Sequence, residues 1–469
     1  VKDFSSRVSK SESKTSNSLY ESMLTYTDTY FEKHRVNVTA VYGIQKYKST
    51  STSMSGTGLP YEHQLYHNIA SVDILQSYGT ELSEWALESY MLRANYVYDD
   101  RYLLTLTGRV DGSSRLAEGN KYGLFPSMAV AWHIANEDFM NNIDFLSVLK
   151  LRFSIGQTGN TGINPYQTQG LLSIGNMYSF SGNEVRYFEH GAIPNPDLKW
   201  ERTLSKNLGL TFGLRNNRLS GSIDVYDNFT FDLMMNRNLP FSTGYSSVLE
   251  NVGETRNRGI EVELSTVNVK TANFSWSTDL NFATNKNEIV SLYGGKDDDI
   301  GNLWFIGEPI NVNYYWMFDG IWQLGEEDAA AVYDKRPGDI REKDVNDDGK
   351  IDDADRVILG TEEPSWIGGM TNRMQYKNLD FSFFIYTVQG TQHRSVYGGG
   401  GYQDLLSLQA HAYQDNMRDV EYWLPDRPTN EFRRPVIGGQ QRDLIQAYFN
   451  TSFTRIKNIT LGYSFPQDM

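Results

Sequence analysis

The stretch "LKLRFSIGQTG" at residues 149–159 opens with a strict alternation of apolar and polar side chains. The apolar positions are Leu149, Leu151, Phe153 and Ile155, and the positions between them are Lys150, Arg152 and Ser154. Because successive side chains of a β-strand point to opposite faces, this period of two predicts a strand with one apolar and one polar face.

The same alternation recurs through the chain, in "LSGSIDVYDN" (219–228), "FSWSTDLNFATN" (274–285) and "LDFSFFIYTVQG" (379–390). The two-faced segments run for about 10 to 14 residues, whereas strands of globular proteins usually have about 5 to 6. With the three stretches above and residues 149–159, the pattern predicts about 13 strands. The other candidates lie near residues 20–32, 34–47, 85–98, 101–111, 122–134, 201–215, 258–268, 366–376 and 452–463.

The composition also favours an all-β architecture. The 469 residues include 40 Gly, 30 Tyr, 23 Phe and 9 Trp, which suit strands and turns better than helix interiors. The mean hydropathy is -0.50. There is no run of the roughly 18 apolar residues that a membrane-spanning helix requires, which excludes a helical membrane protein. Strands of a membrane barrel alternate and show no such run, so a β-barrel is still possible.

The connections between predicted strands divide into two classes. Tight turns are expected at Asp99-Asp100, at Asn216-Asn217, around residues 270–272 and at Lys377-Asn378. Long connections are expected near residues 47–84, 158–200, 230–257, 285–365 and 390–451. Counting strands up and down puts all tight turns on one rim and all long connections on the other, which favours an outer-membrane barrel with long extracellular loops over a soluble sandwich.

Charge and cysteine content exclude several functions. The net charge of -15 argues against binding to nucleic acid, and the absence of cysteine excludes disulfides and thiolate metal sites. The N-terminus "VKDFSSRVSKSESKTSNSLY" lacks the apolar segment of a signal peptide. Because bacterial single-chain barrels close with an even number of strands, an odd count indicates that strands have been missed, that the chain is a fragment, or both. The C-terminus "TLGYSFPQDM" stops directly after a predicted strand, so we expect both ends to be truncated.

The stretch "DVNDDGKIDDAD" at residues 344–355 resembles a calcium-binding loop. Oxygen ligands at alternate positions can surround one hard cation, and the glycine at the sixth position permits the turn that this needs. The expected ligands of a structural calcium ion are Asp344, Asn346, Asp348, the carbonyl of Lys350, Asp352 and Asp355. The alternative is an acidic turn held by hydrogen bonds between Asp or Asn side chains and the backbone.

Enzyme motifs are missing, because the sequence contains no "GxSxG", "HExxH" or "GxxxxGK[ST]" pattern and its 7 His are scattered. A pair of glycosidase carboxylates could be hidden among the 58 acidic residues, but nothing singles out such a pair. Aromatic residues in connections could stack on sugars, with ordinary packing as the alternative. These candidates are Trp304, Tyr314, Tyr315, Trp316 and Trp322.

Eight segments in order resemble the SusC-like (SusC/RagA) subfamily of TonB-dependent outer-membrane transporters, over about residues 85–469. They are "YLLTLTGRVDGSSRL", "YGLFPSMAVAWHIANEDFM", "LKLRFSIGQTGN", "NPDLKWERT", "NVGETRNRGIEVEL", "DVNDDGKIDDADRVILG", "YKNLDFSFFI" and "RIKNITLGYSFP". The resemblance implies a 22-stranded transmembrane antiparallel β-barrel with a plug domain, of which this chain is a portion without the plug.

The resemblance further implies a location in the outer membrane of a Gram-negative, Bacteroidetes-type bacterium. It implies import of a nutrient, an oligosaccharide or a peptide, together with a SusD-like surface lipoprotein that forms a lid and with TonB acting through an N-terminal region. Two alternatives from the residues themselves are an extracellular calcium-dependent carbohydrate-binding or adhesive β protein, and a secreted glycan-cleaving enzyme.

Overall fold

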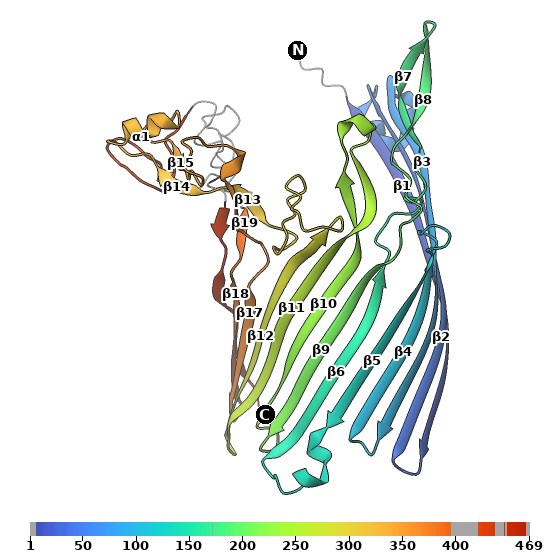
Figure 1. Cartoon of the computed structure of the whole chain (residues 1–469), viewed down its shortest axis with the longest axis vertical. Coiled ribbons are helices and arrows are strands. Elements are labelled where there is room, and N and C mark those ends of the chain that lie inside the picture. Colours follow the sequence, from blue (N-terminus) through green and yellow to red (C-terminus); the bar gives the residue numbers. More distant parts are fainter. Residues whose placement is uncertain (1–5, 171, 395–420, 437–444, 446–447, 466–469) are drawn as a thin grey trace. The chain divides into compact units, whose positions relative to one another are not determined.

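A single large sheet contains most of the described strands (Figure 1). The computed structural model describes residues 6–394 except 171, residues 421–436, residue 445 and residues 448–465. The sheet has 13 strands, which lie side by side in the order of the sequence. Every pair of neighbouring strands whose register is described is antiparallel. The strands are β1 (Arg7–Tyr30), β2 (His34–Thr57), β3 (Ile74–Tyr98), β4 (Tyr102–Ser113), β5 (Tyr122–His133), β6 (Leu146–Asn160), β9 (Glu201–Leu214), β10 (Leu219–Asn238), β11 (Ser247–Lys270), β12 (Phe274–Leu292), β17 (Trp366–Tyr376), β18 (Leu379–Gln389) and β21 (Phe453–Tyr463).

The connections contain the remaining elements. Four small two-stranded sheets pair β7 (Leu172–Phe180) with β8 (Asn183–His190), β13 (Asn313–Trp316) with β16 (Arg356–Gly360), β14 (Phe318–Ile321) with β15 (Ile340–Glu342), and β19 (Gln392–Arg394) with β20 (Tyr448–Asn450). The described helices are α1 (Glu327–Val332) and short 3₁₀ turns at Glu62–Ser71, Ile134–Asn136, Asp138–Met140, Phe241–Thr243 and Asp353–Asp355. No helix among the described residues has the length and apolar character needed to cross a membrane.

The chain forms two compact units, and each has its own small hydrophobic cluster. Unit 1 comprises residues 1–142, 150–208 and 228–254, and unit 2 comprises residues 143–149, 209–227 and 255–469. The cluster of unit 1 contains Leu116, Phe125, Ile163, Leu198 and Trp200. The cluster of unit 2 contains Trp316, Ile321, Ile340, Trp423 and Ile445. Both clusters draw most of their residues from the connections, so they stabilise the loops.

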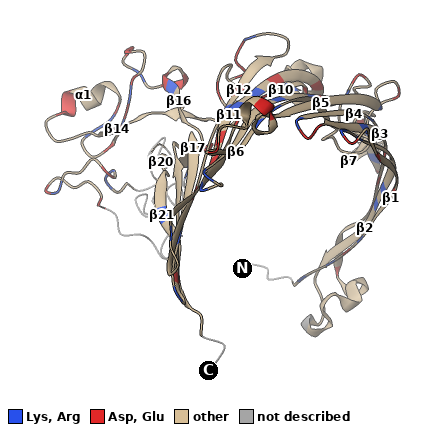
Figure 2. Cartoon of the chain, turned by 90° about the horizontal axis from the view of Figure 1, so that it is seen from below, with Lys and Arg blue, Asp and Glu red and all other residues tan. Residues whose placement is uncertain are grey.

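Among the described residues, no second large sheet covers the strands of this one. Apolar side chains of its strands are exposed, for example Leu24 (75%), Leu92 (57%) and Leu461 (68%). In a soluble sandwich such side chains would be buried against a second sheet. Tan, the colour of all residues other than Lys, Arg, Asp and Glu, predominates along the strands in Figure 2.

Within each unit, the tight turns lie at one end of the strands and the long connections at the other, except that the connection 134–145 between β5 and β6 lies at the tight-turn end. In unit 1, residues 31–33 and 99–101 join strands at one end, and residues 58–73 and 114–121 join them at the other. In unit 2, residues 271–273 and 377–378 are the short turns, and residues 293–365 and 390–452 are the long connections. Asp99 and Asp100 have φ of 52° and 51°, values typical of the two central residues of a hairpin turn.

All 13 strands predicted from the sequence are present, but several are longer than predicted. β2 continues to Thr57 and β3 begins at Ile74, so the connection expected near residues 47–84 is only residues 58–73. The connection expected near 230–257 shrinks to residues 239–246, and that near 285–365 begins at residue 293. The β2 extension "KSTSTSMSGT" is polar on both faces and therefore shows no alternation. The β10 extension is not of this kind, because it begins with "FTFDLMM" at residues 229–235. Much of the expected connection 390–451 lies outside the described residues.

A glycine in β11 marks a close approach between strands of unit 2. A Cβ on Gly259 would collide with the carbonyl oxygen of Thr284 and the hydroxyl of Tyr226, which itself donates to Asn285 Oδ1 at 3.0 Å. Tyr226 therefore occupies the space that a side chain at residue 259 would need.

We expect Gly259→Ala to lower the free energy of unfolding by about 1–3 kcal/mol, because the added methyl displaces Tyr226 or bends the strand. Equilibrium urea unfolding of the full-length protein in detergent micelles measures the change. The matched control is Gly79→Ala in β3, where a Cβ would meet nothing within 4 Å. Equal unfolding midpoints for the two variants would contradict the steric argument.

Candidate functional site

One face of strands β3, β4 and β5 is a continuous apolar surface. Leu92, Leu106 and Met128 occupy it, each exposed, and cross-strand pairing aligns Ala94 with Leu106 and Leu106 with Met128. At the tight-turn end of this surface lie Tyr98, Tyr102 and Trp132, which pair directly across the three strands. Their rings stack, with centroids 6.3 Å apart between Tyr98 and Tyr102 and 6.4 Å apart between Tyr102 and Trp132.

A second aromatic row crosses the same face nearer the long connections. Tyr42 pairs with Tyr90 across β2 and β3, and their ring centroids are 5.2 Å apart. Tyr122 of β5 pairs with Gly112 of β4. From Tyr102 to Gly112 the strand rises about 33 Å at roughly 3.3 Å per residue, which a tilt of roughly 40° reduces to a height of about 25 Å. That height matches the apolar band of an outer-membrane barrel, whose edges carry aromatic girdles.

The second row has a carboxylate at its centre. Glu88 accepts hydrogen bonds from the hydroxyls of Tyr42 at 3.2 Å, Tyr90 at 2.8 Å and Tyr122 at 2.9 Å. Three strands contribute to this contact, because Tyr42 lies on β2, Glu88 and Tyr90 on β3, and Tyr122 on β5, which β4 separates from β3. The three donors satisfy both carboxylate oxygens and fix the rings at the edge of the apolar band.

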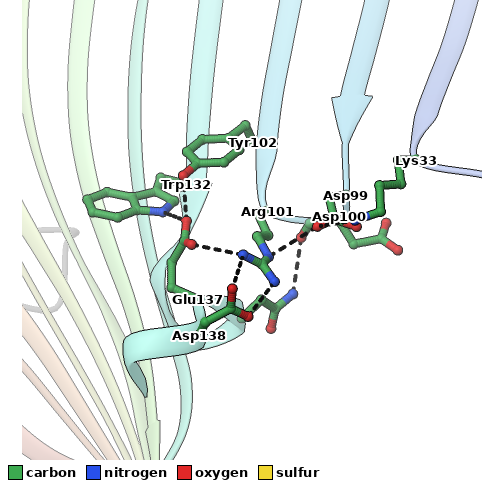
Figure 3. Close-up of polar contacts among 9 residues, drawn as sticks. Lys33, Asp99, Asp100, Arg101, Tyr102, Trp132, Glu137 and Asp138 are labelled. Atoms are coloured by element: carbon green, nitrogen blue, oxygen red, sulfur yellow. Dashed lines mark hydrogen bonds and ion pairs between the residues drawn. The ribbon is translucent and has the colours of Figure 1, made fainter. Parts of the chain in front are cut away.

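The first row is fastened to the connection between β5 and β6 (Figure 3). Glu137 Oε1 accepts from the Tyr102 hydroxyl at 2.6 Å and from Trp132 Nε1 at 2.8 Å, and its other oxygen accepts from Arg101 Nη1 at 3.1 Å. Arg101 also pairs with Asp138 at 2.8 Å and with Asp99 at 3.4 Å. One arginine of the β3–β4 turn thus links the neighbouring connection to two interfacial aromatics.

These contacts shift the ionisation of the acid and the base that they join. Hydrogen bonds from Tyr102 and Trp132, with the charge of Arg101, hold the pKa of Glu137 below its ordinary value. The hydrogen bond and charge of Asp138 raise the pKa of Arg101. Both groups are therefore charged at neutral pH, and the network is a set of charge-assisted hydrogen bonds.

The opposite face of unit 1 is polar. Asn37 Nδ2 donates to Thr27 at 2.8 Å, Asn95 Nδ2 donates to Asn37 at 3.1 Å, and the Thr105 hydroxyl donates to Asn95 at 2.9 Å. This ladder of amides and hydroxyls crosses four adjacent strands. On the same face Arg109 Nε pairs with Asp111 at 2.8 Å, and Arg109 Nη2 donates to Ser89 at 3.0 Å.

A recess of about 740 Å³ opens on this polar face. Its lining includes Arg93, Thr107, Ser127 and Thr158, with the aromatics Phe125 and Trp200 of the unit 1 cluster. Trp200 is 4% exposed and donates its ring N–H to the carbonyl of Lys121 at 2.9 Å. The recess therefore offers hydroxyl and guanidinium groups to a solute, and its tryptophan is a packing residue.

The aromatic residues of the connection 293–365 that could stack on sugars differ in their exposure. Trp316 and Trp322 are each only 7% exposed, so they cannot serve as open stacking platforms. Arg356 lies 4.3 Å from the ring centroid of Trp316, and Arg341 lies 5.3 Å from that of Trp322. For these two residues the packing interpretation is correct. Trp304, Tyr314 and Tyr315 are half-buried, and sugar stacking on them stays a prediction.

The acidic loop 344–355 folds around its own backbone. Its side chains accept from backbone amides, Asp344 from Gly349 at 2.8 Å, Asn346 from Asp348 at 3.1 Å and Asp348 from Lys350 at 2.9 Å. Asp352 accepts from Ala354 at 2.8 Å, and the fully buried Asp355 accepts from Val345 at 2.9 Å and from Asp352 at 2.8 Å. Gly349 has a φ of +80°, as the turn requires.

These hydrogen bonds affect both ionisation and the calcium interpretation. Burial acts to raise the pKa of Asp344, but hydrogen bonds from Gly349, Tyr333 and neighbouring amides outweigh it and lower the pKa. Among the described residues, no three His, Cys, Asp or Glu side chains converge as metal ligands do. The loop has the carboxylate and amide oxygens that a calcium site needs. Its carboxylates, however, accept hydrogen bonds from backbone amides, as expected for the alternative of an acidic turn without an ion. Calcium binding therefore stays a prediction.

A family model described as "TonB dependent receptor-like, beta-barrel" matches residues 3–357. The chain belongs to the TonB-dependent receptor family. The chain is 35% identical to TonB-dependent receptor P26 of Formosa agariphila over 470 residues, covering 96% of this chain and 46% of that receptor. It is 34% identical to TonB-dependent receptor SusC of Bacteroides thetaiotaomicron over 393 residues, covering 81% of this chain and 38% of SusC.

The fold agrees with this receptor family. The RagAB peptide transporter structure superposes with a TM-score of 0.78 at 23% identity, over 98% of this chain and 50% of that chain. The chain spans about half the length of the relatives it matches. The predicted SusC-like family, the transmembrane β-barrel fold and the outer-membrane location are therefore confirmed. Receptors of this family are transporters, which agrees with the prediction that the chain is not an enzyme.

Sequence reasoning did not identify the two carboxylates that hold the aromatic rows. Glu137 follows Trp132 within "AWHIANED", and Glu88 lies two residues before Tyr90. The nearness of an acidic to an aromatic residue in the sequence was therefore the signal that could have identified both. The partners from other strands were not visible, because Arg101, Tyr42 and Tyr122 are brought near only by strand register.

We expect Glu137→Gln to lower the melting temperature of the receptor by a few degrees at neutral pH, because Arg101, Tyr102 and Trp132 lose a charged acceptor. Since the folded-state pKa of Glu137 is lowered, its stabilisation is present above the ordinary value of 4.5 and is lost as pH falls through the folded value. The difference between wild type and variant should therefore shrink in acid.

Thermal unfolding of the full-length receptor in detergent, near neutral pH and near pH 3, tests this pH dependence. Asp100→Asn is the control, because Asp100 is 71% exposed in its pair with Arg35 and such pairs contribute little. A Glu137→Gln difference that stays constant across the pH range would show that the charge of Glu137 has no role.

Proposed function

We propose that this chain is the barrel portion of a TonB-dependent importer that carries a nutrient across the outer membrane. The observation that carries the proposal is the family match over residues 3–357, which falls on a sheet with an apolar face, two aromatic rows and an opposite polar face. A polar face suits the passage of a hydrophilic solute. The long connections would then face the cell exterior, as in other outer-membrane barrels.

We infer that the solute is an oligosaccharide, with a peptide as the second candidate. The described polar face supports a polyhydroxylated solute, because its ladder of Thr27, Asn37, Asn95 and Thr105 offers neutral donors and acceptors. The guanidinium of Arg109 is paired with Asp111, and that of Arg93 donates to the Thr107 hydroxyl, so both cations already have partners on this face. A peptide stays in consideration because RagAB, whose fold this chain shares, is a peptide transporter.

We propose two protein partners for the complete receptor. A SusD-like surface lipoprotein would cover the mouth and form the lid, and TonB would supply energy through the N-terminal region of the complete protein. The cluster of unit 2 supports a lid contact, since Trp316 and Ile321 of the connection 293–365 pack with Trp423 of the connection 390–452 and give the two connections a shared core. A folded surface can bind a partner without first losing conformational entropy.

We further propose that calcium rigidifies the connection 293–365 at this lid contact. The acidic loop lies against the unit 2 cluster, because Trp316 Nε1 donates to the carbonyl of Asp352 at 2.6 Å and Ile351 packs on the cluster. Asp344 is bonded to Tyr333, whose ring stacks on Trp322. A bound cation would offset the repulsion among the loop carboxylates and transmit order to these aromatics.

Deleting the gene of the complete receptor should abolish growth of the source bacterium on one class of oligosaccharide and leave growth on the constituent monosaccharide unchanged. Only solutes too large for ordinary porins need an energised importer. Growth curves on defined carbon sources, with the full-length gene restored as the control, give the measurement. Normal growth on every oligosaccharide, with a defect on peptides, would transfer the assignment to peptides.

Replacing Asp344 and Asp348 with Ala should weaken calcium binding about tenfold or more, because two of the expected carboxylate ligands are lost. It should also weaken binding of the lid lipoprotein. Calorimetry with calcium and pull-down of the lid, on the full-length receptor in detergent, measure the two effects. Asp353→Ala is the control, since Asp353 is 81% exposed and is not an expected ligand. Lid affinity that is unchanged by a chelator would overturn the role assigned to calcium.

A further inference from the structure

The apolar face of unit 1 contains a hollow that the transport function does not require. The recess has a volume of about 760 Å³, and its largely apolar lining includes Leu92, Leu106, Gly108, Pro126, Met128 and Ile155 together with residues of β9 and β10. Thr107, Ser127 and Gln157 also contribute to the lining. Gly108 and Pro126 pair with each other on β4 and β5, and Leu92 pairs with Gly108 on the other side. The hollow therefore lies across neighbouring strands at the level of Gly108.

Two residues with little or no side chain above the sheet create the hollow. A Cβ at Gly108 would meet nothing within 4 Å, so the space over this residue is empty of protein. Pro126 is unusual inside a sheet because it has no N–H to give to a neighbouring strand. Leu106 and Met128 pair at the next level of the same face, and Met128 pairs with Ile155. These longer side chains make the wall on the tight-turn side.

The hollow lies inside the apolar band, closer to the row of Tyr42, Tyr90 and Tyr122 than to the row of Tyr98, Tyr102 and Trp132. Gly108 is about 13 Å from Gly112 along β4, at roughly 3.3 Å per residue, and Gly112 pairs with Tyr122. At that depth no water is present to fill a cavity. If the cavity were empty, the side chains that line it would lose van der Waals contacts. Hydrocarbon must therefore occupy the space.

We propose that this recess is a binding site for one acyl chain of a lipid in the outer leaflet of the outer membrane. The recess opens on the same face as the exposed apolar side chains of Leu92, Leu106 and Met128, which is the face that an outer-membrane barrel turns to hydrocarbon. The chain enters from the row of Tyr42, Tyr90 and Tyr122, where the headgroups lie, and ends over Leu106 and Met128. The leaflet assignment rests on the proposed orientation, in which the long connections face the exterior.

A chain in this recess differs from the lipids around it. The acyl chain of an ordinary neighbouring lipid touches the protein along one side only. An acyl chain in the recess contacts Leu92, Pro126 and Met128 on several sides. Each additional pair of carbon atoms in contact contributes a small attraction, and many such pairs add up to slower exchange. The site needs no hydrogen bond, so it selects for chain shape and tolerates different headgroups.

The test uses the full-length receptor in nanodiscs that contain a trace of phosphatidylethanolamine with a photoreactive diazirine acyl chain. After irradiation, mass spectrometry of the peptides locates the attached chain. Peptides of β4 and β5 should be labelled about threefold or more above those of β18 and β21, whose Phe381, Ile459 and Leu461 also face lipid, because a held chain stays in contact for longer. Gly108→Leu should fill the recess and remove this excess.

Val110→Leu is the matched control, since it enlarges a side chain on the same face of β4 outside the recess lining. It should leave the labelling of β4 and β5 unchanged. Even labelling of all lipid-facing strands, or an excess that survives Gly108→Leu, would overturn the site. A recess that is labelled only after a co-purified lipoprotein or a second copy of the receptor is removed would show that a protein, and not a membrane lipid, is its occupant.

Failure of this site can be told apart from failure of the proposed transport function. A Gly108→Leu receptor that still reaches the outer membrane and supports growth on the substrate, yet keeps the wild-type labelling, refutes only the acyl-chain site. A deletion strain with no growth defect refutes only the transport assignment, because the labelling depends on the barrel wall alone.

Discussion

The need to pair every backbone N–H and C=O within hydrocarbon is the constraint on which this structure depends. A lipid-exposed strand cannot borrow hydrogen bonds from water, so strands must pair with strands along their whole membrane-spanning length. Once that pairing is fixed, the pleat assigns alternate side chains to opposite faces. Lipid then requires one face to be apolar, as in Leu92, Leu106 and Met128, and water on the other side favours a polar face, as in Asn37, Asn95 and Thr105.

Two carboxylates fix the edges of the apolar face by accepting hydrogen bonds from the aromatic side chains there. Glu88 gathers three tyrosine hydroxyls at one border, and Glu137 gathers Tyr102 and Trp132 at the other. A carboxylate at the membrane interface remains solvated by these donors, while the rings stay at the depth where amphipathic side chains are most stable. Arg101 extends the second border into the turn region, so the wall and its turns are held as one polar network.

The long connections lie beyond the hydrogen bonds of the large sheet, so other contacts must hold them in place. Each unit does so with a compact apolar cluster, around Leu198 and Trp200 in unit 1 and around Ile321 and Ile340 in unit 2. The acidic loop 344–355 is ordered by hydrogen bonds from its own amides and rests against the second cluster. Order of this kind lets a connection present a defined surface, which the proposed lid contact needs.

The sequence alone determined the local features of this protein. Alternation at residues 149–159 and its repeats located all 13 strands of the sheet, and residues such as Asp99 and Asp100 marked the tight turns, because period and turn chemistry are encoded by adjacent residues. Strand extensions such as residues 48–57 were missed, since a strand wet on both faces has no alternation. Only the tertiary structure placed Tyr42 and Tyr122 on Glu88, Arg101 on Glu137, and Gly108 opposite Pro126. These contacts depend on the register between strands, which long-range pairing sets and no single stretch of sequence contains.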